Sequence, residues 1–471
     1  MPVFDQPNLR ARFTLALTVP DGWTAVGNGP TVGAPPTVSL PGRDAAGTAA
    51  DAGTFVFGPT QPIPTYRFAF AAGRFVVEQA ERAGRTFRMF HRETDTAKVA
   101  RNRTAVFDLH ERALTWLEDY TGIAYPFGKF DFVLIPSFQY GGMEHPGSVF
   151  YRQEGVLLEE SATQAELLGR ANLISHETSH MWFGDLVTLD WFDDVWTKEV
   201  FANFMAAKIV HPSFPEVDHQ LRFLLSNHPT AYRVDRTAGA NPIRQPLANL
   251  QEAGTLYGPI IYQKAPVVMR HLEQRVGETV LRDGLREYLT RFSFGNATWP
   301  DLVQILDART PEDLAAWSHV WVEEPGRPTV SVVFETDGAV IRRLGVRQED
   351  PEGKGRLWPQ RLQLALVYPD SVANVEVDLA GAEAWAESAA GRPAPRLVLP
   401  NGSGVEYGRF VLDERSLAAL LEQLPSLPTP VLRGAAWVTL WDAVLDGSVA
   451  PDRFLAPVSY THLTLPTNSR V

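Results

Sequence analysis

The pentapeptide His176-Glu177-Thr178-Ser179-His180 matches the H-E-x-x-H pattern, whose residue types suit hydrolytic metal chemistry. Residues i and i+4 of a helix lie on one face about a turn apart, so the two imidazoles can converge on one cation. Glu177 can reach a water molecule near that cation without binding the cation itself, which makes it a candidate general base. A pattern this short can also be a buried polar turn of a helix, so its surroundings have to decide.

A catalytic zinc site needs a third protein ligand and leaves its fourth position open. Glu199 follows His180 after eighteen intervening residues and lies in a second predicted helix, residues 195–210. If residues 184–194 turn the chain back, Glu199 faces the histidine pair. The predicted ligand set is therefore His176, His180 and Glu199, with one Zn²⁺ per chain.

The helix that carries the histidines should begin at Thr163, because Glu166 three residues later completes a capping box. A long amphipathic helix is predicted upstream, from about Thr94 to Gly122. An apolar strand should follow over residues 130–135. Further helices are predicted over residues 259–276 and 277–292.

The two ends of the chain show more β pattern than its middle. Apolar and polar residues alternate with period 2 in four segments, which are residues 12–19, 65–70, 329–334 and 363–368. Residues 27–64 are rich in Gly, Pro and Ala, which favours loops and short strands. A helical pattern resumes at Ser416. The predicted fold class is multidomain α+β.

The composition is typical of a globular protein with several cores. The chain has 471 residues, 45% of them hydrophobic, a length that favours roughly two to four domains. Its net charge of −12 argues against nucleic acid as a partner. It has no cysteine, so any metal must be held by histidine and carboxylate. No apolar run approaches the roughly 20 residues of a membrane span, and we expect a cytoplasmic protein.

The motifs, in this order along the chain, resemble those of the aminopeptidase N family of zinc metallopeptidases, gluzincins that also include leukotriene hydrolase. That family pairs H-E-x-x-H with a glutamate eighteen residues later, as this chain does with Glu199. Three further motifs agree in part. They are Gly141-Gly142-Met143-Glu144-His145 for G-x-M-E-N, Tyr262-Gln263-Lys264-Ala265 for Y-x-K-G, and Phe4-Asp5-Gln6-Pro7 for F-D-x-P. The resemblance extends from residue 4 to about residue 457.

The resemblance implies an enzyme that hydrolyses the first bond of peptides with a free N-terminus. It makes Glu177 and Tyr262 catalytic, with Tyr262 stabilising the oxyanion that forms from the attacked carbonyl. It makes Glu144 the carboxylate that pairs with the substrate's α-ammonium and so measures one residue from the terminus. Gly141 and Gly142 would let the backbone approach the peptide closely, as an added β-strand.

The chain also departs from the family pattern. His145 replaces the usual Asn, and we expect it to form a hydrogen bond near the cleft rather than to bind metal. Lys198, Val200 and Ala265 replace the usual Asn, Gly and Gly. The family has a second amine-contacting Gln or Glu shortly before F-D-x-P, and this chain starts at that motif.

Several side chains near the histidines have open roles. Three carboxylates are candidates to orient the imidazoles, and the sequence does not choose among Asp185, Asp193 and Asp194. An aromatic run is predicted to form core between the two metal helices rather than a substrate pocket. It consists of Trp182, Phe183, Trp191, Phe192 and Trp196.

The patterns and the resemblance together predict five segments. They are a partial N-terminal β-domain (1–90), a thermolysin-like, mostly helical zinc catalytic domain (91–324), a β-sandwich domain (325–415), the start of a truncated helical domain (416–457), and an artefactual tail (458–471). The tail resembles translated adapter sequence.

Two other interpretations stay open. An endopeptidase or an epoxide hydrolase could use the same scaffold, and a truncated homologue could act only as a binding module. The complete set of predicted metal and catalytic residues speaks against decay of the site. A comparison of free-amine and N-blocked substrates separates the enzyme classes.

Overall fold

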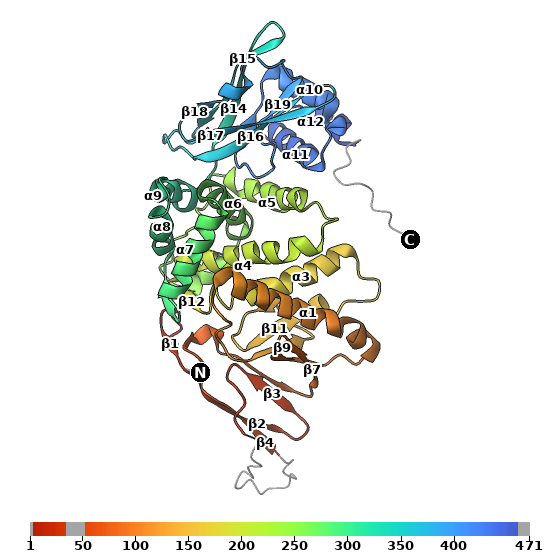
Figure 1. Ribbon diagram of the computed structural model, residues 1–471, viewed down its shortest axis with the longest axis vertical. Coiled ribbons are helices and arrows are strands. Elements are labelled where there is room, and N and C mark those ends of the chain that lie inside the picture. The colour runs from red at the N-terminus through yellow and green to blue at the C-terminus, as the bar shows by residue number, and fades with distance from the viewer. Residues whose placement is uncertain (1–2, 34–51, 460–471) are drawn as a thin grey trace. The chain divides into compact units, whose positions relative to one another are not determined.

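A computed structural model describes residues 3–33 and 52–459, which divide into two compact units (Figure 1). One unit comprises the chain up to Pro215 together with Arg282–Ile305, and the other comprises Glu216–Leu281 and the chain from Leu306 onward. Helices and several sheets occur in both, so the structure has the predicted mixed α+β character. The predicted tail, residues 458–471, lies outside the described residues apart from its first two positions.

The first unit contains a five-stranded sheet of order β10-β11-β9-β8-β7. The central strand β9 pairs in parallel with β11 and β8, and the edge strands β10 and β7 pair antiparallel. These strands are β7 (Val76–Arg82), β8 (Arg85–His91), β9 (Phe130–Ile135), β10 (Gly142–Met143) and β11 (Ser148–Arg152). The predicted strand over residues 130–135 is confirmed, and burial of five of its six residues explains why it lacks alternation.

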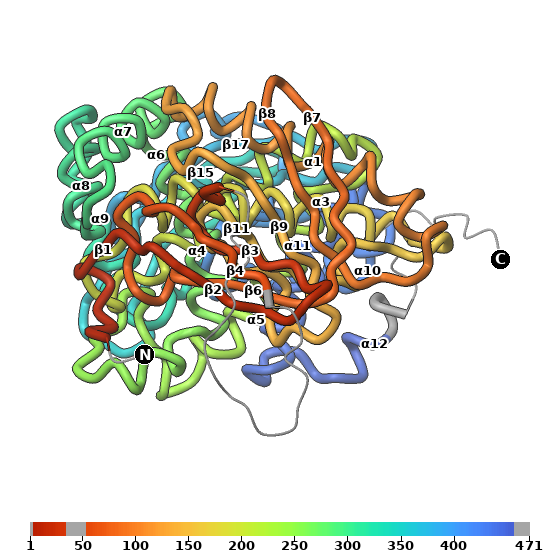
Figure 2. Tube along the Cα trace, turned by 90° about the horizontal axis from the view of Figure 1, so that it is seen from below, coloured from red at the N-terminus to blue at the C-terminus, as the bar shows by residue number. Residues whose placement is uncertain are grey.

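Two helices of the first unit, α1 (Thr96–Thr121) and α3 (Gln164–Ser179), lie along one side of this sheet (Figure 1). Figure 2 shows β7 and β8 in front of these helices in the view from below. Asp95 caps α1 and Gly122 ends it with a left-handed φ of 70°, so the predicted bounds are confirmed. The predicted capping box of Thr163 and Glu166 is present at the start of α3. The second predicted metal helix is α4 (Val195–Val210), with the bounds expected from the sequence.

The N-terminal residues form short paired strands in the same unit. They are β1 (Arg10–Ala11) with β5 (Ile63–Pro64), β2 (Leu15–Pro20) with β4 (Ala52–Phe57), and β3 (Thr24–Gly27) with β6 (Phe70–Gly73). The prediction of a strand over residues 65–70 is wrong for its first part, because Thr65–Arg67 is a 3-10 turn, η1, and β6 begins only at Phe70. This turn places Arg67 in the interior, where it is completely buried. The remaining elements of the unit are α2 (Gln153–Val156), β12 (Val187–Leu189), η2 (Phe192–Asp194), η3 (His211–Ser213) and β13 (Gly295–Ala297).

The second unit contains two sheets that share one hydrophobic core. The four-stranded sheet has the order β18-β15-β14-β20, and the three-stranded sheet has the order β17-β16-β19. Their strands are β14 (Thr329–Asp337), β15 (Val340–Glu349), β16 (Gln360–Val367), β17 (Val372–Leu379), β18 (Glu383–Trp385), β19 (Leu397–Leu399) and β20 (Arg409–Val411). Val330 of β14, Leu364 of β16 and Val377 of β17 are among the buried side chains that meet in this core. The strands predicted near residues 329–334 and 363–368 are confirmed within a few residues at their ends.

The sequence did not predict the helix over residues 219–235 in this unit. The helices predicted over residues 259–276 and 277–292 are present with one local exception. Residues 260–264 form a π-helical turn, η5 (Ile260–Lys264), and the α-helix α6 (Ala265–Val276) starts after it. The other elements are α5 (His219–Asp235), η4 (Leu250–Thr255), α9 (Leu314–Ser318), η6 (His319–Glu323), η7 (Glu387–Ala389), α10 (Glu414–Gln423), η8 (Leu424–Ser426), α11 (Pro430–Leu445) and α12 (Pro451–Ser459). Helices α7 (Glu278–Arg291) and α8 (Trp299–Asp307) each contribute residues to both units. In the described ranges, no helix combines the length and apolar character that crossing a membrane requires.

A fully buried histidine in the first unit predicts acid sensitivity. The ring of His110 stacks on Phe132 with 4.1 Å between centroids, and its Nδ1 donates to the Val106 carbonyl at 2.8 Å. Burial lowers the pKa of His110 to about 4. The unfolded chain, with a pKa of about 6.5, takes up this proton first as pH falls, so the group reduces stability between about pH 6.5 and pH 4, by up to roughly 3 kcal/mol.

Replacing His110 by phenylalanine should therefore flatten the fall of the free energy of unfolding between pH 6.5 and pH 4. Urea unfolding of both proteins across this range measures the effect. The variant His319→Phe is the matched control, because the His319 side chain is 64% exposed. An unchanged slope in the His110 variant would contradict the prediction.

Candidate active site

Packing of α3 against α4 brings the three predicted metal ligands together. His176 and His180 come from the end of α3, and Glu199 comes from α4. The two imidazole Nε2 atoms lie 3.0 Å apart. Oε2 of Glu199 lies 3.5 Å from Nε2 of His176 and 3.8 Å from Nε2 of His180. The site is largely buried, since the His180 and Glu199 side chains are 1% and 8% exposed.

The donor set fits a tetrahedral metal ion. Ligand atoms at about 2.0–2.1 Å from Zn²⁺ lie about 3.3 Å from each other in a tetrahedron, close to the observed separations. The Phe183 carbonyl, 3.0 Å from Nδ1 of His180, can only accept a hydrogen bond, so Nε2 of His180 presents its lone pair. Oδ1 of Asn203 orients His176 in the same way, 3.0 Å from its Nδ1.

The charges around this set also suit a cation. Burial lowers the pKa of His180 to about 3, so its imidazole is neutral. Burial also acts to lower the pKa of His176, but the hydrogen bond to Glu199 and the charges of nearby carboxylates outweigh it and raise that pKa to about 9. A metal ligand must be a neutral imidazole, so metal binding has to displace the proton of His176. Burial would raise the pKa of Glu199, yet Lys198 and the imidazoles hold it well below its ordinary value.

Glu177 lies beside the ligand set, as a general base requires. Its carboxylate belongs to a second cluster with Glu144 and His180, in which the ligand atoms are all within 4.8 Å of one another. Burial, together with the charges of Glu144 and Glu199, raises the pKa of Glu177 to about 8. A carboxylate with a raised pKa can accept a proton and return it near neutral pH.

The strand β10 positions Glu177 through a close backbone contact at Gly142. A Cβ atom at Gly142 would lie 2.5 Å from Cδ and 2.6 Å from Cγ of Glu177, so that any side chain there would displace the base. Gly142→Ala should lower kcat about 10-fold to 100-fold, with bound metal unchanged. Gly169→Ala on α3 is the matched control, because a Cβ there meets no atom within 4 Å. Wild-type kcat in the Gly142 variant would contradict this prediction.

A chain of buried ion pairs leads into the site, and sequence reasoning missed its two cations. Arg67 contacts Asp185 at 2.8 Å and Glu144 at a shorter distance. Lys198 then bridges Oε1 of Glu144 at 2.9 Å and Oε1 of Glu199 at 2.6 Å. Arg67 and Lys198 gave no local signal of this role, because each meets its partners only after folding. Glu144, Asp185 and Glu199 were already candidates from the sequence. Glu144 is thus paired with two cations at once.

Other side chains near the histidines have structural roles. Of the three candidate aspartates, Asp185 pairs with Arg67, while Asn203 and the Phe183 carbonyl orient the imidazoles. His145 is buried and its Nδ1 bonds the carbonyl of Arg67 at 3.2 Å, which agrees with a hydrogen-bonding role. In the aromatic run, Trp182, Phe183 and Trp196 are buried core, whereas Trp191 and Phe192 are half-buried.

Comparison with known proteins agrees with this geometry. Residues 105–321 match the model of the peptidase family M1 domain. Aminopeptidase N of Streptomyces lividans is 29% identical over 472 residues, which cover 97% of this chain and 53% of that protein. Aminopeptidase N of Lactobacillus helveticus is 30% identical over 423 residues, 88% of this chain and 48% of that protein. The puromycin-sensitive aminopeptidase of Caenorhabditis elegans is 28% identical over 439 residues, which cover 92% of this chain and 45% of that protein.

The chain belongs to peptidase family M1. It spans about half the length of the curated relatives it matches. The span that matches the M1 domain includes the three predicted metal ligands, Glu177 and Tyr262. The matched span begins at residue 105, so Arg67, the buried cation that pairs with Glu144, lies outside it.

The tyrosine motif of this M1 chain lies in the second unit. Tyr262 sits in the π-helical turn η5 and stacks on Tyr257 with 6.3 Å between centroids. Lys264 of the same motif is fully buried, contacts Asp235 at 2.9 Å and donates to the Gly326 carbonyl at 2.7 Å. π-Helical turns are rare and occur frequently at functional sites. The oxyanion role of Tyr262 stays a prediction.

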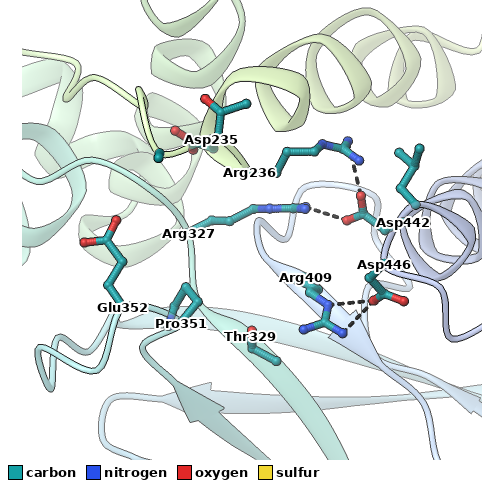
Figure 3. A pocket seen from close by; sticks show the side chains of 12 residues that line it. Asp235, Arg236, Arg327, Thr329, Pro351, Glu352, Arg409, Asp442 and Asp446 are labelled. Carbon is teal, nitrogen blue, oxygen red and sulfur yellow. Dashed lines mark hydrogen bonds and ion pairs between the residues drawn. The ribbon is translucent and has the colours of Figure 1, made fainter.

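The second unit of the M1 chain also contains a charged cavity of about 690 Å³ (Figure 3). Arg327 pairs with Asp442 at 2.5 Å, Arg236 pairs with the same carboxylate at 3.3 Å, and Arg409 pairs with Asp446 at 2.5 Å. Neither of the two candidate metal clusters among residues 3–33 and 52–459 includes a residue of this cavity. Its three arginines are already paired with Asp442 and Asp446, so we assign it no ligand.

Proposed function

We propose that this chain is a zinc-dependent aminopeptidase, which removes the N-terminal residue from peptides. One observation carries the proposal: the donor set of His176, His180 and Glu199 lies beside both a candidate base, Glu177, and a buried carboxylate suited to an ammonium group, Glu144. The relatives named above as aminopeptidases support the substrate class.

Each predicted site residue would have a distinct role. When bound, Zn²⁺ would supply Lewis-acid polarisation and a lower pKa for water. Glu177 would accept the proton from the attacking water and later deliver it to the leaving amine. Glu144 would hold the substrate's α-ammonium and so restrict cleavage to the first bond. Tyr262 would donate a hydrogen bond to the developing oxyanion.

The edge strand β10 would align the peptide. As the last strand of its sheet, it pairs on one side with β11 only, so an extended peptide can add to its other side. Gly141 and Gly142 present no side chain to such a peptide. This arrangement would present the first peptide bond to Glu177, which Gly142 contacts.

A matched pair of reporters tests the proposal. An aminoacyl reporter with a free α-amine should be hydrolysed at least about 100-fold faster, in kcat/KM, than the same reporter with an acetylated amine. A chelator should abolish the activity, and zinc should restore it. Preferred cleavage of the blocked reporter would indicate an endopeptidase, and epoxide opening alone would indicate an epoxide hydrolase. Absence of turnover in both assays would favour a binding module.

The finer assignments are part of the same proposal. We propose a thermolysin-like catalytic domain over residues 91–324, between an N-terminal β-domain (1–90) and a β-sandwich domain (325–415), followed by a helical segment (416–457). The shared core of the two sheets in the second unit supports the sandwich assignment. A cytoplasmic location stays a prediction.

A further inference from the structure

The proposed amine subsite holds an ammonium group that belongs to the protein itself. Nζ of Lys198 lies 2.9 Å from Oε1 of Glu144, and the two side chains are 8% and 4% exposed. A lysine ammonium and a peptide α-ammonium are the same chemical group, each with a positive charge and N–H donors for carboxylates. Lys198 therefore makes the contact to Glu144 that the proposed function assigns to the substrate.

The two cations at Glu144 differ in how firmly they are held. Arg67 is fully buried and is fixed from its other side by Asp185, so it is a permanent partner. Lys198 has a flexible four-carbon stem and a second carboxylate partner, Glu199, at 2.6 Å. It can leave Glu144 and keep its ion pair with Glu199. Lys198 is therefore the cation that can exchange.

Charge repulsion favours this exchange. A substrate ammonium that joined both Arg67 and Lys198 at Glu144 would place three cations around one carboxylate in a buried site, where like charges repel strongly. Exchange of one ammonium for another keeps the balance of charge. The contact of Lys198 is thus in direct competition with the substrate.

We propose that Lys198 competes with the substrate's α-ammonium for Glu144, so that a peptide enters this subsite only by displacing it. The inference rests on the proposed function, because it takes Glu144 as the amine subsite. Lys198 is accordingly a specificity-determining residue. It weakens binding of every ligand that brings an ammonium group to Glu144 and leaves the binding of ligands without one unchanged.

A double-mutant cycle with two matched alcohols tests this competition. L-Leucinol carries a free amine and no scissile bond, and 4-methylpentan-1-ol is the same molecule without the amine. Calorimetric titration of the zinc-loaded chain should show L-leucinol binding about tenfold more tightly to Lys198→Met than to wild type. Affinity for 4-methylpentan-1-ol should stay unchanged. In the Glu144→Gln background, the Lys198 substitution should have no effect on L-leucinol.

Other outcomes would overturn the proposal. No gain in L-leucinol affinity, an equal gain for the alcohol without the amine, or the same gain in the Glu144→Gln background would each exclude competition at Glu144.

Lys198→Asn provides a second uncharged variant, and melting temperatures verify that both fold. In catalysis, both should lower KM for free-amine substrates more than they change kcat. If the double-mutant cycle gives the expected affinities but the wild-type protein hydrolyses no peptide, the proposed function is wrong and the competition at Glu144 still holds.

Discussion

Replacing Glu177 by alanine is expected to lower kcat by about 10³-fold or more while the protein keeps its metal. Glu177 lies beside the three predicted metal ligands but is not one of them. Its raised pKa of about 8 suits a group that accepts and returns a proton. Steady-state kinetics and metal analysis on the same sample measure both effects. Glu160→Ala is the control, because Glu160 is an exposed carboxylate outside α3.

The isosteric variant Glu177→Gln separates proton transfer from packing. Its amide keeps the volume beside Gly142 and removes the basic oxygen, so its kcat should fall as far as that of the alanine variant. Near wild-type kcat in either variant would exclude Glu177 as the base.

Replacing Glu199 by alanine should cost the protein its metal, with more than about 100-fold loss of affinity, because only two imidazoles would remain as ligands. Equilibrium dialysis and competition with a chelator measure the affinity directly. The variant should also lose the difference in melting temperature between samples with and without chelator, because that difference reflects metal binding to the folded state.

The same measurement decides between two possible metal clusters. One consists of His176, His180 and Glu199, and the other of Glu144, Glu177 and His180, so His180 is common to both. If the first cluster binds the ion, Glu199→Ala loses metal and Glu177→Ala retains it. Normal metal content in the Glu199 variant, with loss in the Glu177 variant, would transfer the assignment to the second cluster.

Local sequence signals were sufficient for the two helices that form the centre of the site. The capping box at Thr163 and Glu166 is complete within four residues, and no glycine or proline interrupts the sequence of α4. Given two helices, the spacing of His180 and Glu199 and a reversal of the chain between them, the ligand set could be predicted. The observed atomic separations agree with it.

Local signals failed where a partner is distant in sequence. The alternating residues from Thr65 predicted a strand, but Arg67 turns into the interior to meet Asp185, 118 positions later. Lys198 looks like an ordinary helix residue, and only folding shows that it reaches back to Glu144. The π-helical turn at Tyr262 has the same apolar pattern as an α-helix, so the sequence predicted one continuous helix.

The burial of Arg67 has a consequence for protein engineering. Its guanidinium comes from a segment before α1, yet it is the counter-charge of Asp185 and Glu144, whose side chains are almost fully enclosed. A recombinant piece trimmed to start at α1 would leave these carboxylates facing each other without that neutralising group, a loss that typically amounts to several kcal/mol. The smallest transplantable piece that keeps this site intact therefore has to include the segment that carries Arg67.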